Sequence, residues 1–123
     1  MRPVILSILL VTALAAPAQA QTYPVSGKWG ESSNSEKGTI DCTNNRRVIE
    51  FNDDQRTDSN GGVPAYRNKS VTPAGLSTYR IVDEFSNGQV SAGQSAYTLR
   101  EIDADRIEMD NIDGSTLRLQ RCE

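Results

Sequence analysis

Histidine is absent from this 123-residue chain, and its only two thiols are Cys42 and Cys122. Histidine is the commonest general base and a usual zinc or copper ligand, so its absence excludes Ser-His-Asp and Cys-His nucleophile pairs and most such metal sites. The acidic residues show no spacing that is typical of paired catalytic carboxylates. We therefore expect a protein that is not an enzyme and that has no resident metal or cofactor.

Basic residues are too few to support binding to nucleic acid. Lysine and arginine together number 13, against 16 acidic residues, and the formal net charge is −3. Because recognition of phosphates requires a basic patch, we expect no nucleic-acid partner. The two signs are well mixed along the chain, so neither forms a charged tail.

Long apolar runs are also missing, except at the N-terminus. Arg2 precedes the apolar run 4–16, and the small-x-small pattern of residues 18–20 follows it. This order is typical of a bacterial-type signal peptide, and the run is shorter than the roughly 20 residues that span a membrane. We predict a signal peptide at residues 1–20 and a single mature domain at 21–123, either periplasmic or secreted and not inserted in a membrane. An uncleaved N-terminal anchor is the alternative.

The two cysteines lie in the predicted mature part. An exported chain meets an oxidising compartment, and an even number of cysteines favours a disulfide. A redox-active pair would lie close in sequence, as in C-x-x-C, whereas these residues are about 80 positions apart. We therefore predict a structural disulfide between Cys42 and Cys122, which would contribute about 4–5 kcal/mol in the chain-entropy model.

Short runs of alternating polar and apolar residues, separated by turn residues, dominate the mature part. This rhythm is typical of an antiparallel β-meander, barrel or sandwich, and no helix is expected. The polar, turn-rich segment 52–73 is expected to be a long loop with at most a short strand near 65–67. Cys122 has the opposite parity to Leu117 and Leu119, which places the disulfide at a rim and not in the core. The runs expected to form strands are 25–29, 39–42, 47–51, 76–85, 95–101, 106–109 and 115–122.

Residues 26–30 read Ser-Gly-Lys-Trp-Gly. Gly27 and Trp29 resemble the Gly-x-Trp signature that opens lipocalins and related calycins. The resemblance implies a small up-and-down β-barrel of six to eight strands, with the Trp at the closed end beneath a cavity. Periplasmic metalloprotease inhibitors and avidins are small members of this group. The chain differs from the former in its nearly C-terminal Cys122, and from the latter in having one Trp only.

Within this resemblance, the leading hypothesis is an exported, monomeric binding module for an unknown small molecule. Its cavity would be lined by Trp29, Tyr79, Phe85 and Tyr97, although core packing would explain these aromatics equally well. The first alternative is an inhibitor of an exported protease, acting through its N-terminal tail or the segment 52–73. A structural accessory protein of the cell envelope is the other alternative. A sizeable apolar cavity would favour the small molecule, whereas a filled barrel with a protruding segment would favour a protein partner.

Overall fold

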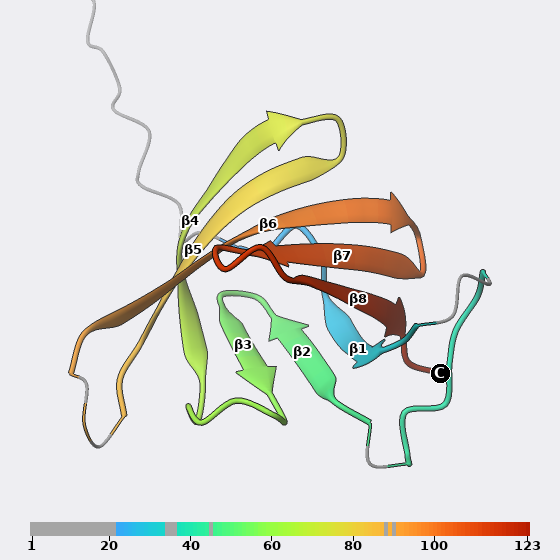
Figure 1. The fold of residues 1–123 in the computed structure, drawn as a ribbon, viewed down its shortest axis with the longest axis horizontal. Coiled ribbons are helices and arrows are strands. Elements are labelled where there is room, and N and C mark those ends of the chain that lie inside the picture. The colour runs from blue at the N-terminus through green and yellow to red at the C-terminus, as the bar shows by residue number, and fades with distance from the viewer. Residues whose placement is uncertain (1–21, 34–36, 45, 88, 90) are drawn as a thin grey trace, which may run out of the picture.

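The computed structural model describes residues 22–33, 37–44, 46–87, 89 and 91–123. These residues form a closed barrel in which strands follow one another in chain order (Figure 1), each antiparallel to its neighbours. The strands are β1 (Gly27–Glu31), β2 (Val48–Asn52), β3 (Gln55–Asp58), β4 (Tyr66–Gly75), β5 (Thr78–Phe85), β6 (Gly93–Asp103), β7 (Arg106–Asn111) and β8 (Thr116–Arg121). The predicted all-β up-and-down barrel is confirmed, with eight strands and no helix in the described part of the chain.

The predicted signal peptide lies outside the described residues. Within the described residues, no helix is long and apolar enough to cross a membrane.

Alternation along the strands turns one apolar face of the sheet toward the barrel axis. Each fully buried side chain of this kind contributes about 1.5–3 kcal/mol relative to exposure. Buried side chains therefore pack the interior of the barrel. Its buried members form one contact cluster of Tyr23, Trp29, Ile49, Phe51, Ile81, Tyr97, Leu99, Ile107, Met109, Leu117 and Leu119.

The prediction of a loop at 52–73 is wrong, because this segment contains β3 and most of β4. The sequence shows no polar–apolar alternation here, because polar residues occupy the buried positions, namely Arg56, Asp58 and Asn68. The expected strand at 39–42 reduces to a single bridge between Ile40 and Cys122. The strand expected at 76–85 begins at Thr78, because residues 76–77 form the turn between β4 and β5.

The disulfide between Cys42 and Cys122 is confirmed, with a Cα–Cα distance of 5.6 Å. It lies outside the core, as parity predicts, at the end of β8. There it fixes the β1–β2 connection against the outer wall: the amide of Ile40 donates to the carbonyl of Arg121 at 2.9 Å. Gly30 permits this approach, because a Cβ at that position would lie 2.8 Å from the Cys42 Sγ.

Figure 1 shows the β4–β5 hairpin at the top of the barrel, with β5 beside β6 up to the turn. β3 pairs with β4 only at Arg67 and Tyr66, whereas β4 pairs with β5 from Arg67 to Gly75, with two shifts of register. The tip of the hairpin is therefore held by its own two strands and by β6, and Leu76 there is 97% exposed.

Candidate functional site

A fully buried carboxylate, that of Asp83, is the most unusual feature of the barrel interior. It accepts four hydrogen bonds. Oδ1 accepts from the hydroxyl of Tyr23 at 2.9 Å and from Nδ2 of Asn68 at 3.2 Å. Oδ2 accepts from Nε of Arg56 at 2.8 Å and from the hydroxyl of Tyr97 at 2.9 Å. We call these five residues the Asp83 network.

The network joins four strands and the segment before β1. Arg56 comes from β3, Asn68 from β4, Asp83 from β5 and Tyr97 from β6. Tyr23 is held in place because its amide donates to the carbonyl of Asp53 at 3.0 Å. Its ring also lies edge-on to a core phenylalanine, with ring centroids 5.0 Å apart. The segment from Tyr23 onward is therefore part of the barrel.

The four donors fill the acceptor capacity of the Asp83 carboxylate, because an ionised carboxylate offers about four lone-pair sites. Burial, together with the charge of Asp83, raises the pKa of Tyr23 and that of Tyr97 well above their usual range. Both phenols therefore remain donors at neutral pH. With these four hydrogen bonds in place, the Asp83 carboxylate is suited to fixing the geometry of the strands around it.

Arg56 lies against two aromatic rings inside the barrel. Its guanidinium carbon is 3.8 Å from the ring centroid of Tyr66 and 5.1 Å from that of Tyr97. Tyr66 in turn packs edge-on against Phe85, with centroids 5.5 Å apart. Burial opposes the charge of the guanidinium, but nearby Tyr97 and Asp83 outweigh it and raise the pKa of Arg56. Arg56 therefore remains cationic next to the rings of Tyr66 and Tyr97.

A second ion pair lies next to the network on β3. Nη2 of Arg47 is 2.6 Å from Oδ2 of Asp58, and its Nε is 3.0 Å from Oδ1. Burial works against the carboxylate, but the hydrogen bonds and charge of Arg47 hold the pKa of Asp58 below its usual range. Each of the two acids, Asp83 and Asp58, therefore has its own arginine.

The four aromatics expected to line a cavity are placed apart. Trp29 is buried in the core, with the Arg121 guanidinium 4.3 Å from its ring centroid. Tyr97 belongs to the Asp83 network, Phe85 packs on Tyr66, and Tyr79 lies half-buried against the core. Tyr97 lies near the Arg56 guanidinium and Phe85 contacts the Tyr66 ring, so the four aromatics are not gathered around one space.

Sequence reasoning passed over Tyr23, Arg56, Asn68 and Asp83. The sequence indicates the position of Asp83 in one way: residues 81, 83 and 85 lie on the same face of the strand, so Asp83 points inward with Ile81 and Phe85. The inward positions of β3 could not be recognised in the same way, because both are charged.

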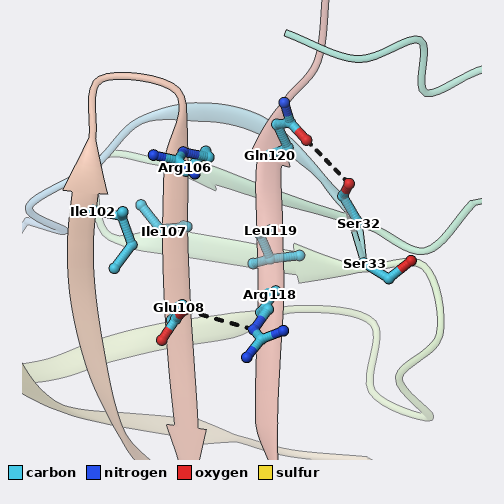
Figure 2. Close-up of a pocket in the computed structure, with 9 residues that line it drawn as sticks. All are labelled: Ser32, Ser33, Ile102, Arg106, Ile107, Glu108, Arg118, Leu119 and Gln120. Carbon is cyan, nitrogen blue, oxygen red and sulfur yellow. Dashed lines mark hydrogen bonds and ion pairs between the residues drawn. The ribbon is translucent and has the colours of Figure 1, made fainter. Parts of the chain in front are cut away.

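Open pockets occur at several places around the barrel, including one whose lining contains the buried Trp29 and Ile107. Figure 2 shows one of about 230 Å³ over β6–β8, where Arg118 and Glu108 pair at 3.6 Å and the Ser32 hydroxyl donates to Gln120 at 3.0 Å. Another, of about 370 Å³, adjoins Tyr66 and Phe85. In the described part of the chain, no group of three or more His, Cys, Asp or Glu residues is placed to hold a metal ion.

The closed eight-stranded antiparallel barrel is consistent with a calycin-like layout. No protein-family model, curated protein or solved structure matches the chain.

Proposed function

We propose that the mature protein is an exported, non-enzymatic module that binds another protein through its β4–β5 hairpin. The observation that carries this proposal is the combination of a packed barrel interior with a hairpin whose apolar tip residue, Leu76, is 97% exposed. The N-terminal signal pattern and the disulfide support export.

The tip of the hairpin is suited to contact with a partner because it is both apolar and ordered. Leu76 is almost fully exposed, and Pro73 and Ala74 beside it are exposed as well. The turn is fixed locally: the Thr78 hydroxyl donates to the Leu76 carbonyl at 2.9 Å, and Ser77 has a φ of 51°. An ordered tip loses little conformational entropy when it binds, which raises affinity.

Inhibition of an exported protease is the specific form of this function that we put first, by analogy with the inhibitors among the calycins. The N-terminal segment is unsuited to insertion into a protease cleft from Tyr23 onward, because Tyr23 is buried and bonded within the barrel. The segment 52–73 lies largely in strands. We place the contact at the hairpin tip because Leu76 has the highest exposed fraction of the large hydrophobic residues described. Transport of a small molecule receives less support, because the interior is filled by side chains.

The test compares the disulfide-bonded mature protein with Leu76→Asp. Ile112→Asp is the matched control, because Ile112 is also an exposed apolar residue, at 82%, but lies in the β7–β8 connection at the opposite end of the barrel. Each protein is immobilised and exposed to the exported proteins of its own cell, and a panel of exported proteases is assayed for inhibition. We expect one partner or inhibited protease that is lost with Leu76→Asp and retained with Ile112→Asp. Equal capture and inhibition by all three proteins would contradict the proposal.

A further inference from the structure

One side of β4 has no neighbouring strand over most of its length. β3 pairs with β4 only at Tyr66 and Arg67, and the amide of Asn68 donates to the carbonyl of Asp54 at 2.7 Å. Beyond that bond, no other strand among the described residues pairs with β4 on the side away from β5. Figure 1 shows the upper part of β4 beside β5 on one side and beside no strand on the other. We call residues 69–75 on this side the free edge of β4.

The direction of the Asn68 amide shows which backbone groups face the free edge. In antiparallel strands, hydrogen-bonded and non-bonded pairs alternate. Because the amide of Asn68 points away from β5, the next pair along, Ser70 with Val82, is a bonded one. The pairs that Val71 and Pro73 form with β5 are then non-bonded, so the backbone of these two residues faces the free edge. The free edge therefore offers the N–H and C=O of Val71 and the C=O of Pro73.

The free edge is protected against indiscriminate pairing but is not closed. An exposed strand edge is a template for a further strand, and natural proteins protect such edges with lysine, proline and irregular pairing. β4 has Lys69, Pro73 and a shift of register between Asn68 and Ser70. Pro73 lacks only an N–H that would face the free edge, so its presence in the strand costs no bond to β5. The donor and acceptor of Val71 remain, and they suffice for one short added strand.

Positive charge without an ion pair lies next to the free edge. Lys69 and Arg80 are exposed, and neither forms an ion pair with any described residue. Residues 69–82 contain no acidic residue, whereas Arg67, the other cation of the hairpin, lies opposite Glu84. An acidic residue on an added strand would compensate Lys69 or Arg80, whereas a second copy of β4 would bring the same cations again.

We propose that the free edge of β4 binds an extended acidic segment of the partner protein, which is added to the barrel as a further antiparallel strand. This inference rests on the proposed function, because it specifies how the partner is held beside the Leu76 tip. One residue of the segment exchanges two backbone hydrogen bonds with Val71, and an N–H two residues away donates to the carbonyl of Pro73. The backbone bonds supply affinity, and a carboxylate near Lys69 or Arg80 supplies specificity.

The first test needs no natural partner. The probe is a peptide of sequence Thr-Val-Glu-Val-Glu-Thr with blocked ends, titrated into the mature, disulfide-bonded protein while NMR follows the backbone amides. One control peptide has lysine in place of glutamate, and another is the acidic peptide N-methylated at every residue, which cannot pair as a strand. We expect saturable shifts at the amide of Val71 with the acidic peptide only, at least about fivefold weaker binding of the basic peptide, and no response at buried Ile107 on β7.

Hydrogen exchange examines the edge directly. In the free protein, the amide of Val71 should exchange faster than that of Thr72, whose residue pairs with Arg80 of β5 in a bonded position. The acidic peptide should slow exchange at Val71 and leave Thr72 unchanged.

Charge reversal tests the specificity. Lys69→Glu should weaken binding of the acidic peptide at least about threefold and strengthen binding of the basic one. Lys37→Glu is the matched control, because Lys37 is also exposed and has no ion pair among the described residues, but lies in the β1–β2 connection. Lys37→Glu should leave both affinities unchanged.

The outcomes separate this inference from the proposed function. A natural partner that is lost with Leu76→Asp but retained with Lys69→Glu, together with no saturable shift at Val71, leaves contact at the hairpin in place and overturns strand addition. If no partner is lost with Leu76→Asp, the proposed function fails, and the peptide titration still decides whether the free edge accepts a strand. Equal binding of the acidic and N-methylated peptides, or slow exchange of the Val71 amide in the free protein, would also overturn strand addition.

Discussion

Nε of Arg56 lies 2.8 Å from Oδ2 of Asp83 inside the barrel, where the two side chains are 4% and 0% exposed. Removing two such charges from water is costly, and their attraction repays that cost only when the remaining hydrogen-bonding groups are also satisfied. Tyr23, Asn68 and Tyr97 satisfy the carboxylate completely. The pair therefore specifies how β3, β4, β5 and β6 meet more than it adds to net stability.

Replacing one member of this pair should cost far more than replacing both. Asp83→Leu leaves the buried guanidinium unpaired, and we expect a loss of about 3–5 kcal/mol in the free energy of unfolding. Arg56→Met combined with Asp83→Leu should recover most of that loss, because neither charge remains. Urea denaturation is applied to the unmodified protein, to Asp83→Leu and Arg56→Met as single variants, and to the double variant. A double variant as unstable as the sum of the single ones would contradict a buried pair.

An exposed ion pair provides the matched control. Nζ of Lys28 is 3.7 Å from a carboxylate oxygen of Glu50, and these side chains are 66% and 37% exposed. Water screens such a pair, so Lys28→Ala and Glu50→Ala should each change stability by less than about 1 kcal/mol.

Stability should fall at alkaline pH because of Tyr23 and Tyr97. Burial and the charge of Asp83 raise the pKa of both phenols in the folded protein. In the unfolded chain they ionise near the ordinary value of about 10. Their contribution to stability is therefore complete below pH 10. Above pH 10, each phenol lowers the free energy of unfolding by about 1.4 kcal/mol per pH unit, until the phenol also ionises in the folded protein.

Tyr97→Phe isolates one of these two phenols. The variant should be less stable at pH 8, because it loses a hydrogen bond to a charged acceptor, but its stability should decline less steeply above pH 10. Urea midpoints measured between pH 8 and 11 give both slopes. Identical slopes for the variant and the unmodified protein would show that the Tyr97 pKa is not raised.

Gly93 should be intolerant of any side chain. A Cβ at this position would lie 2.4 Å from the Phe85 ring, whereas a Cβ at Gly62 would meet nothing within 4 Å. We expect Gly93→Ala to displace Phe85 and to cost about 1–3 kcal/mol, and Gly62→Ala to be nearly neutral. Thermal denaturation measures both. Phe85→Leu in the Gly93→Ala background should restore part of the loss, and no recovery would place the strain elsewhere.

The disulfide should stabilise the barrel from outside. Replacing both Cys42 and Cys122 by serine should lower the free energy of unfolding by up to about 4–5 kcal/mol, the value that the chain-entropy model gives for a loop of about 80 residues. Hydrogen exchange should then rise at the amide of Ile40, whose bond to the Arg121 carbonyl the disulfide supports. A loss of less than about 1 kcal/mol, with unchanged exchange at Ile40, would contradict this role.

The strands were predictable wherever inward positions are apolar, as at Ile107 and Met109 or at Leu117 and Leu119. β3 was not, because its inward residues, Arg56 and Asp58, are charged and their partners come from other segments of the chain. Alternation identifies which face a residue occupies, but it cannot identify a partner 27 positions away, as for Arg56 and Asp83. The Asp83 network depends on such long-range pairing.

Contact between the β4–β5 hairpin and a protein partner can be tested by site-specific photo-crosslinking in the producing cell, with a photoreactive residue replacing Leu76 and, as the control, Ile112. We expect one discrete cross-linked species from position 76, which disappears when Pro73 and Ala74 are also replaced by aspartate, and none from position 112. Absence of any cross-linked species from position 76, or the same cross-linked species from both positions, would contradict contact at the hairpin.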